Sequence, residues 1–244
     1  MSFLSLASQS SYLNFVLRQS FRLMSSSHKK VAVVLSGCGV YDGSEIHEAT
    51  CMLIHLSKAK AKVDVFAPDM DQDHVTNHAT HKQVPEKRNC LVESARISRG
   101  NVTALSKLNP ADYDALFFPG GFGAATNLCN FASASGDCKV IPDVEKAIKA
   151  FHDLQKPIGL CCIAPVLAAR CIKGAHVTIG TDPGTAGAIE EMGAHHENCQ
   201  ITEVCVDQKN FIVTAPAYMC GTATIADIYE NIGLLVQKVF SLIK

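Results

Sequence analysis

An apolar segment that runs directly into a helix-forming segment is the strongest constraint on the fold of this chain. Residues 157–165 read Pro-Ile-Gly-Leu-Cys-Cys-Ile-Ala-Pro, and a helical pattern follows over residues 166–170. A strand that turns this sharply into a helix holds the residue at the turn on the carboxyl edge of a sheet, with its side chain exposed. The N–H groups and dipole of the new helix stabilise a thiolate or an oxyanion there. The segment therefore predicts an α/β fold with a cysteine nucleophile at its sheet edge.

Strand-like and helix-like segments alternate along most of the chain. Strands are expected at 31–35, 63–67, 115–118 and in the segment ending at Cys162, helices at 44–57, 144–154 and 222–243, and a hairpin from 204–207 and 211–214. Strands separated by helices form a mostly parallel sheet covered on both faces. Residues 68–110 and 180–200 interrupt this alternation of strands and helices. They are either insertions that form the walls of a site or ordinary surface loops. We expect one domain over residues 29–244.

Charge and cysteine content exclude several classes of function. A formal net charge of −1 gives no electrostatic reason to bind nucleic acid or an anionic membrane. No apolar run approaches the roughly 20 residues that span a bilayer, so we expect neither nucleic acid nor membrane as a partner. The eleven cysteines include no Cys-x-x-Cys pair. They are expected to be mostly reduced core thiols in a reducing compartment, without a metal.

The amino-terminal segment has the composition of a targeting peptide. Residues 1–41 contain no acidic residue, and arginines, serines, leucines and phenylalanines alternate among them. Such a segment resembles a mitochondrial transit peptide, whereas a secretory signal needs a continuous apolar core. We expect residues 1–28 to be a transit peptide or a disordered leader, and the protein to be mitochondrial, in the matrix. Initiation at Met24 would instead give a cytosolic form.

A second strand-to-helix junction carries the glycine pair Gly120-Gly121. Glycines allow the backbone to approach a ligand, and their N–H groups can hold an anion, although a tight turn alone also explains the pair. The spacing is not that of a dinucleotide-binding loop. Beside a cysteine at the neighbouring strand, the N–H groups of Gly121 and Ile163 could bind the oxyanion formed when Cys162 attacks a carbonyl.

The order of these motifs resembles the ThiJ/PfpI branch of the class I glutamine amidotransferase-like superfamily over residues 30–240. Residues 36–47, Ser-Gly-Cys-Gly-Val-Tyr-Asp-Gly-Ser-Glu-Ile-His, and residues 119–125, Pro-Gly-Gly-Phe-Gly-Ala-Ala, are more specifically similar to mitochondrial ES-one proteins and the bacterial enhancing lycopene biosynthesis protein. The resemblance implies a flavodoxin-like sandwich, no cofactor and a homodimer.

The same resemblance assigns roles to a few positions. The elbow cysteine falls on Cys162, and Cys161 is expected to be a core thiol one residue inside the strand. The family's helix glutamate falls best on Glu48, with Glu45 as the reserve. An ionised carboxylate would raise the thiol pKa, whereas a protonated one would donate to a thiolate and move a proton; we favour the second because burial raises a carboxyl pKa.

Departures from the superfamily pattern limit the chemistry. Ile163 stands where the superfamily's proteases have a histidine, and no histidine follows His196, so matching motifs gives no Cys-His-Glu triad. His196 is either an accessory site residue or part of a surface loop. His47 neighbours Glu48 but faces about 100° away on the helix. His74, His78 and His81 have metal-ligand spacing but no helix to hold them, so no metal site is predicted.

These observations favour a cofactor-free cysteine enzyme that acts on small carbonyls such as glyoxal or methylglyoxal. An aldehyde accepts a thiolate without an amine to expel, so the missing histidine matters less. The alternative is a thiol-based redox-sensing or interaction protein, since a reactive thiol beside a carboxyl also suits oxidation. A hydrolase or amidase that borrows His196 is the third possibility.

Overall fold

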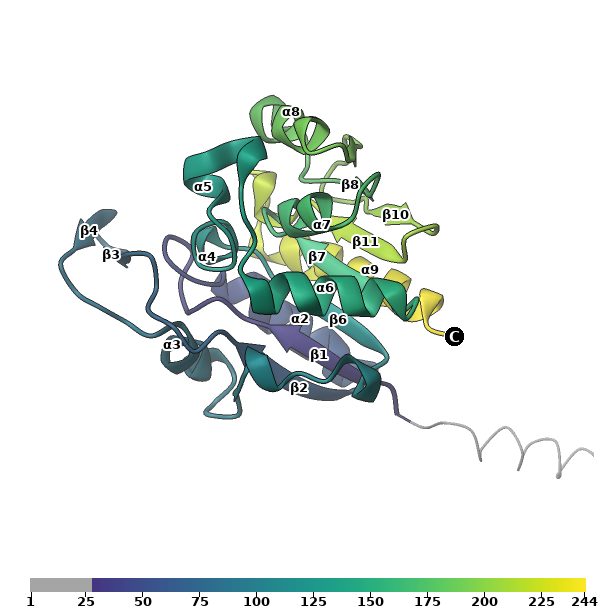
Figure 1. Ribbon diagram of the computed structural model, residues 1–244, viewed down its shortest axis with the longest axis horizontal. Coiled ribbons are helices and arrows are strands. Elements are labelled where there is room, and N and C mark those ends of the chain that lie inside the picture. The colour runs from purple at the N-terminus through teal and green to yellow at the C-terminus, as the bar shows by residue number, and fades with distance from the viewer. Residues whose placement is uncertain (1–27) are drawn as a thin grey trace, which may run out of the picture.

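A seven-stranded sheet forms the centre of the computed structural model, which describes residues 28–244 (Figure 1). The predicted leader, residues 1–28, lies outside the described residues apart from its last position. In spatial order the strands are β10 (Cys205–Asp207), β11 (Ile212–Ala215), β7 (Ile158–Cys161), β6 (Ala115–Phe118), β1 (Lys30–Val34), β2 (Lys62–Ala67) and β5 (Thr103–Ala104). Every pairing is parallel except β10–β11. The predicted α/β, flavodoxin-like fold with a mostly parallel sheet is confirmed.

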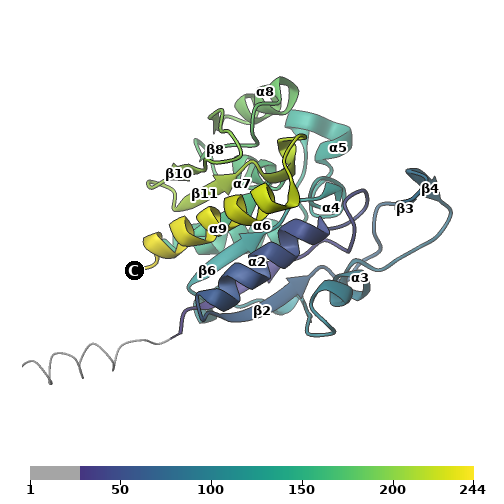
Figure 2. The same ribbon diagram turned by 180° about the vertical axis from the view of Figure 1, so that it is seen from behind.

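Helices cover both faces of this sheet. α6 (Pro142–Asp153) and α7 (Pro165–Cys171) lie on one face, and α2 (Ile46–Lys58) and α9 (Ile225–Leu242) on the other, as the front and back views show (Figures 1 and 2). Successive side chains of a strand point to opposite faces. In β1, Val31 and Val33 therefore pack with α2 and α9, whereas Ala32 and Val34 pack with α6 and α7. Burial on both faces explains why the strands are continuous apolar runs.

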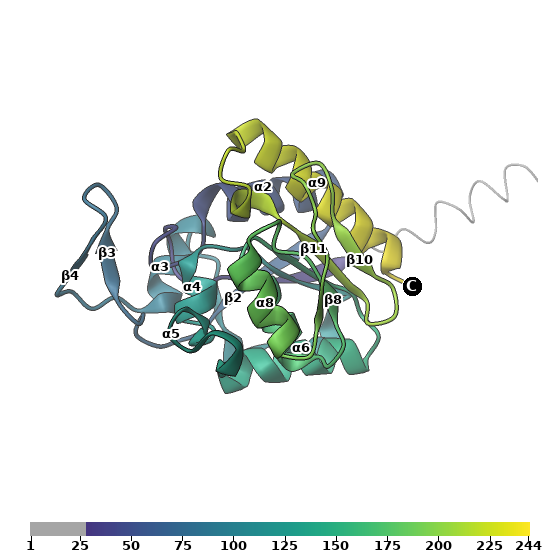
Figure 3. The same ribbon diagram turned by 90° about the horizontal axis from the view of Figure 1, so that it is seen from above.

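Residues 68–110 contain several short elements that the sequence did not predict. These are β3 (Val75–Asn77), β4 (Lys82–Val84), α3 (Cys90–Ile97) and the edge strand β5. β3 and β4 form an antiparallel hairpin that projects from the body of the molecule (Figures 1 and 3). α3 is capped by Asn89, whose side chain accepts from the Val92 N–H. The strands are too short for an alternating pattern to be recognised. The Asn89 cap is therefore the one signal in the sequence that could have predicted any of these elements.

The second insertion places a helix over the carboxyl edge of the sheet. α8 (Pro183–Glu191) connects β8 (His176–Val177) to β9 (His195–His196), and these two strands pair in parallel outside the central sheet. α4 (Phe122–Thr126) and α5 (Phe131–Ala134) follow β6 at the same edge. Figure 3 shows α4, α5 and α8 gathered above the strands. Among residues 28–244, no helix combines the length and apolar character that crossing a membrane requires.

The packing of β7 gives a test of this core. A Cβ added at Gly159 would lie 2.8 Å from Phe117 Cδ1 and 2.9 Å from Val239 Cγ2, both in the core. Gly159→Ala is therefore expected to lower the free energy of unfolding by about 1–3 kcal/mol, as overpacked cores do. Urea denaturation of the purified protein measures this change.

Gly187→Ala is the matched control, because Gly187 lies in α8 with nothing within 4 Å of an added Cβ. Alanine is the better helix former, so the control is expected to keep or raise the stability by up to about 1 kcal/mol. Equal stability of Gly159→Ala and wild type would contradict the packing described for β7.

Candidate active site

Cys162 occupies the turn between β7 and α7. β7 ends at Cys161 and α7 begins at Pro165. Cys162 has φ of +58°, in the left-handed region that non-glycine residues rarely adopt, and its N–H donates to the Ala215 carbonyl at 3.0 Å. Such a conformation persists only where the surrounding structure imposes it, and it is common at nucleophile elbows. The local geometry is that of the predicted elbow.

The glycine pair after β6 allows the backbone to reach the cysteine. A Cβ at Gly120 would lie 2.3 Å from Cys162 Cβ and 2.6 Å from Glu48 Oε2. Gly121 has φ of +93°, and a Cβ there would lie 2.3 Å from the Gly43 carbonyl oxygen. No side chain fits at either position, which is the physical reason for two glycines here.

Two backbone donors converge on the Cys162 sulfur. The N–H groups of Gly121 and Ile163 lie close enough to the sulfur to lower the pKa of the thiol. Two opposing effects are larger, because burial raises that pKa first and the charge of Glu48 raises it further. The net effect is a pKa well above the usual range, so the resting residue is a thiol. A reaction at Cys162 therefore needs a nearby group to accept its proton.

Glu48 is the carboxyl beside the thiol. It lies in the first turn of α2 and is fully buried, and its charge raises the pKa of the nearby Cys162 thiol. Its Oε2 accepts from the Gly120 N–H at 2.9 Å, and its Oε1 accepts from the Tyr218 N–H at 3.2 Å. Burial, reinforced by the charge of Glu45, raises the pKa of Glu48 to about 7. Near neutral pH this carboxyl is therefore populated both with and without its proton.

Cys161 and Glu45 lie close to this pair. The Cys161 thiol is buried on the α2–α9 side of the sheet and donates to Glu48 Oε2 at 3.7 Å. It was expected to be a core thiol, and its contact with Glu48 was not foreseen. Glu45 precedes α2 as its N-cap, where its side chain accepts from the Glu48 N–H at 2.7 Å. Glu48 rather than Glu45 therefore contacts the thiols.

Tyr218 and His47 complete the site; sequence reasoning missed Tyr218 and set His47 aside. Tyr218 lies on the short turn Ala217–Met219, between β11 and α9. Its hydroxyl lies 2.8 Å from His47 Nδ1, while its N–H reaches Glu48. His47 does face away from Glu48, as expected, but a tyrosine from another segment bridges the two residues. This contact depends on how α2 and the turn before α9 pack together, and no local pattern reports it.

The other predicted histidines lie elsewhere. His196 is in β9, where its Nε2 accepts from the Ile179 N–H at 3.3 Å, and it is not among the residues that line the cavity at Cys162. His78 and His81 pack against the Tyr41 ring, and His74 pairs with Asp73 at 3.0 Å. The structure therefore brings Cys162, Glu48, Gly121, Ile163 and Glu45 together and leaves His196 apart.

A cavity of about 310 Å³ opens at Cys162. Apolar side chains from α4, α5 and neighbouring turns form most of its wall, and Glu45, Thr185 and Tyr218 supply the polar groups. Thr185 comes from α8, so the second insertion does form part of the wall. An apolar cavity with a few convergent polar groups and a buried titratable residue is typical of a site for a small organic molecule.

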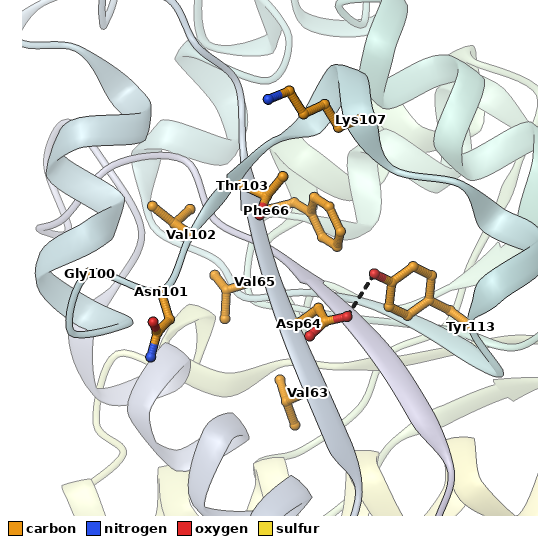
Figure 4. A pocket seen from close by; sticks show the side chains of 10 residues that line it. All are labelled: Val63, Asp64, Val65, Phe66, Gly100, Asn101, Val102, Thr103, Lys107 and Tyr113. Carbon is orange, nitrogen blue, oxygen red and sulfur yellow. Dashed lines mark hydrogen bonds between the residues drawn. The ribbon is translucent and has the colours of Figure 1, made fainter.

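A second hollow lies at the β2–β5 edge of the sheet (Figure 4). It measures about 480 Å³ and is lined by Val63, Asp64, Val65, Phe66, Gly100, Asn101, Val102, Thr103, Lys107 and Tyr113. Within it, the Tyr113 hydroxyl donates to Asp64 Oδ2 at 2.8 Å, and Lys30 Nζ lies 3.0 Å from the same oxygen. These three side chains pair with one another, and none of them is a nucleophile beside a base. The Cys162 cavity is therefore the better candidate for an active site.

Fold and site together define a glutamine amidotransferase-like protein with a cysteine elbow. Rat "ES1 protein homolog, mitochondrial" is 52% identical over 223 residues, covering 87% of this chain and 84% of the relative. Human "Glutamine amidotransferase-like class 1 domain-containing protein 3, mitochondrial" is also 52% identical over 223 residues, covering 87% and 83%. The chain belongs to this mitochondrial ES1 family, as the resemblance predicted. Both names confirm the expected mitochondrial localisation.

Solved structures agree with this assignment, although the chain matches no model of a known protein family. An isoprenoid biosynthesis protein with an amidotransferase-like domain from Ehrlichia chaffeensis superposes with a TM-score of 0.82 at 35% identity, covering 88% of this chain and all of that one (100%). A ThiJ/PfpI domain protein from Brachyspira murdochii superposes with a TM-score of 0.55 at 14% identity, covering 88% and 98%, and shows the shared fold alone.

The raised pKa of Glu48 predicts a pH-dependent stability. Its ordinary value is 4.5 and its folded value is about 7. As pH rises between these values, the unfolded chain loses this proton before the folded chain does, so the free energy of unfolding falls and then levels off above about pH 7. The expected contribution is about 3 kcal/mol, from roughly 1.4 kcal/mol per pH unit.

Urea denaturation from pH 4.5 to 8 measures this effect as the difference between wild type and Glu48→Gln. The amide cannot accept from both the Gly120 and Tyr218 N–H groups, so a constant offset in stability is expected as well. The slope is therefore the test, and identical slopes for the two proteins would show that Glu48 does not titrate in this range.

Proposed function

We propose that this chain is a cofactor-free cysteine enzyme that converts small 2-oxoaldehydes into hydroxy acids. The observation that carries the proposal is a buried carboxyl of pKa about 7 that lies next to Cys162, and Cys162 lines an apolar cavity. Among the described residues, no histidine lines that cavity. A group whose pKa lies near the working pH both accepts and donates protons efficiently. Glu48 therefore takes the role that a histidine has in related hydrolases.

The reaction begins when the Cys162 sulfur attacks the aldehyde carbon. The thiol proton passes to the Glu48 carboxylate, and the carbonyl oxygen becomes the hydroxyl of a hemithioacetal after it gains a proton. Glu48, which has passed the thiol proton to that oxygen, then removes the proton on the same carbon while the neighbouring carbonyl oxygen gains a proton, which gives an enediol. Glu48 returns its proton to the second carbon of the enediol, and the first hydroxyl releases its proton to water. This gives a thioester of a 2-hydroxy acid. Water hydrolyses the thioester, restores the Cys162 thiol and releases the acid with no net oxidation.

The N–H groups of Gly121 and Ile163 stabilise negative charge in this sequence. At rest they lower the pKa of the Cys162 thiol, which favours the thiolate as the proton leaves. Once sulfur is bonded to carbon, the same donors hold the oxygen on that carbon. Preorganised backbone donors of this kind are often the largest single contribution to an enzymatic rate.

Tyr218 supplies the proton at the far side of the substrate. Its side chain lines the cavity, and burial raises the pKa of its hydroxyl, which therefore stays protonated at neutral pH. His47 Nδ1 lies 2.8 Å from that hydroxyl and is itself exposed to solvent. The hydroxyl donates to the substrate ketone oxygen as the enediol forms, and His47 returns a proton to it from water.

Product formation from glyoxal and methylglyoxal tests the proposal. Cys162→Ser is expected to abolish glycolate and lactate production by the full chain, and Glu48→Gln to lower kcat by about 10²- to 10⁴-fold, the usual contribution of a general base. Cys161→Ser is the matched control at the adjacent thiol and is expected to remain active. No product above buffer from the wild-type protein would overturn the proposal.

Substitutions at Tyr218 and His47 test the proposed proton transfer from the Tyr218 hydroxyl to the substrate. Tyr218→Phe is expected to lower kcat by about 10²-fold with little change in KM, as does loss of one transition-state donor. His47→Gln is expected to lower kcat by a smaller factor, because His47 acts on the substrate only through the Tyr218 hydroxyl. Tyr229→Phe is the control, because Tyr229 contacts His55 and Lys58 rather than the cavity. Equal rates for Tyr218→Phe and Tyr229→Phe would exclude this role.

A second candidate function uses the same thiol as a redox sensor. Cys161 donates to Glu48 Oε2 at 3.7 Å, Cys162 lies beside the same carboxyl, and a protonated Glu48 can donate to an oxygen of a Cys162 sulfinic acid formed by peroxide. The resting thiol of raised pKa favours the carbonyl enzyme, because peroxide reacts with thiolates.

An amidase that uses His196 has no support from the position of that residue. Assembly as a homodimer remains a prediction.

A further inference from the structure

Three side chains with metal-binding atoms meet at the edge of the molecule formed by β8, β9 and β10. Within residues 28–244, His176, Glu197 and Cys205 form one group whose ligand atoms all lie within 4.8 Å of one another. His176 Nε2 and Glu197 Oε2 are 3.2 Å apart. None of the three lines the Cys162 cavity, so this group is independent of the proposed carbonyl chemistry.

The backbone holds each of these residues in place. The His176 N–H donates to Asp207 Oδ2 at 2.8 Å, and the Glu197 N–H donates to the Val177 carbonyl at 2.9 Å. Cys205 pairs with Thr214 in the β10–β11 ladder, and its thiol donates to the His176 carbonyl at 3.5 Å. The three ligand atoms therefore come from segments that are joined directly to β8. Such preorganisation is what a metal site requires of its protein.

An ion pair explains two of these residues but not the third. Surface pairs between histidine and glutamate are common and contribute little. Here the Cys205 thiol lies beneath the ion pair and is 1% exposed, while the His176 and Glu197 side chains are 44% and 49% exposed. A cation arriving from solvent would meet the imidazole and carboxylate first and the sulfur last.

The donor set selects the cation. Imidazole nitrogen, thiolate sulfur and carboxylate oxygen are the three ligand types of protein zinc sites, whereas Ca²⁺ and Mg²⁺ take oxygen ligands. A thiolate and a carboxylate together offset the two positive charges of the ion. Three protein ligands leave a fourth tetrahedral position, which water fills.

We propose that His176, Glu197 and Cys205 bind Zn²⁺. His176 offers the Nε2 lone pair, Glu197 one carboxylate oxygen, and Cys205 its sulfur after the thiol proton is released to solvent. The bound ion ties β10 to both ends of the β8–α8–β9 insertion, whose helix α8 carries Thr185 to the wall of the Cys162 cavity. The site therefore anchors an element that shapes the candidate active site.

Cobalt spectroscopy of the full chain tests this proposal. Protein treated with a chelator and then titrated with Co²⁺ is expected to show a thiolate-to-cobalt charge-transfer absorption at one equivalent, which Zn²⁺ displaces. Cys205→Ser is expected to abolish this absorption. Cys199→Ser is the matched control, because Cys199 is a buried thiol of the same segment outside the group, and it is expected to retain the absorption. Cys162→Ser is also expected to retain it, which excludes binding at the elbow.

Zinc titration calorimetry gives a second measurement that does not alter the core. Glu197→Gln changes an exposed side chain, and it is expected to weaken Zn²⁺ binding by more than about 100-fold, since even changes outside the ligand shell cost roughly 10- to 100-fold. The proposal is overturned if the wild-type chain binds neither ion. It is also overturned if Cys205→Ser and Glu197→Gln bind Zn²⁺ as tightly as wild type, or if Cys199→Ser rather than Cys205→Ser removes the cobalt absorption.

Discussion

The burial of the Glu48 carboxyl is the constraint on which the rest of the site depends. Moving a carboxyl out of water is costly unless its oxygens are hydrogen-bonded. Glu48 meets this requirement with backbone donors from two distant segments, Gly120 after β6 and Tyr218 after β11. The Cys161 thiol at the end of β7 donates a further hydrogen bond. β7 lies between β6 and β11 in the sheet, so the strand order itself brings these groups around one side chain.

The position of Glu48 on its helix sets the balance between its two protonation states. The first turn of α2 favours a negative charge through the helix dipole. Burial and the nearby charge of Glu45 act in the opposite direction, and they prevail, since the pKa rises to about 7. Without the two backbone N–H bonds the carboxyl would be more strongly neutral and a poorer proton acceptor. The same contacts that make burial tolerable therefore keep the group able to exchange protons near neutral pH.

Local sequence signals were sufficient for the elbow but not for its surroundings. The strand-to-helix junctions at Cys162 and Gly121 are short-range patterns, and strands β1, β2, β6 and β7 stand out in the sequence as largely apolar runs. A two-residue strand such as β5 is too short to form such a run. The Tyr218–His47 contact joins residues 171 positions apart. It depends on how the turn before α9 packs against α2, so it could only be found in three dimensions.

The protonation state of the Cys162 thiol could not be predicted from the sequence, because it depends on burial and on the nearby charge of Glu48. Because Cys162 rests as a thiol, the proposed addition to a carbonyl requires Glu48 to accept the thiol proton before it passes that proton on. Amide hydrolysis needs in addition an acid positioned at a departing amine. His47 meets the site through the Tyr218 hydroxyl at 2.8 Å and through a Glu45 carboxyl oxygen at 3.8 Å, and it does not line the cavity. An aldehyde has no leaving amine, and both proton transfers that it needs fall on Glu48 and Tyr218. This distribution of groups favours carbonyl isomerisation over amide cleavage at Cys162.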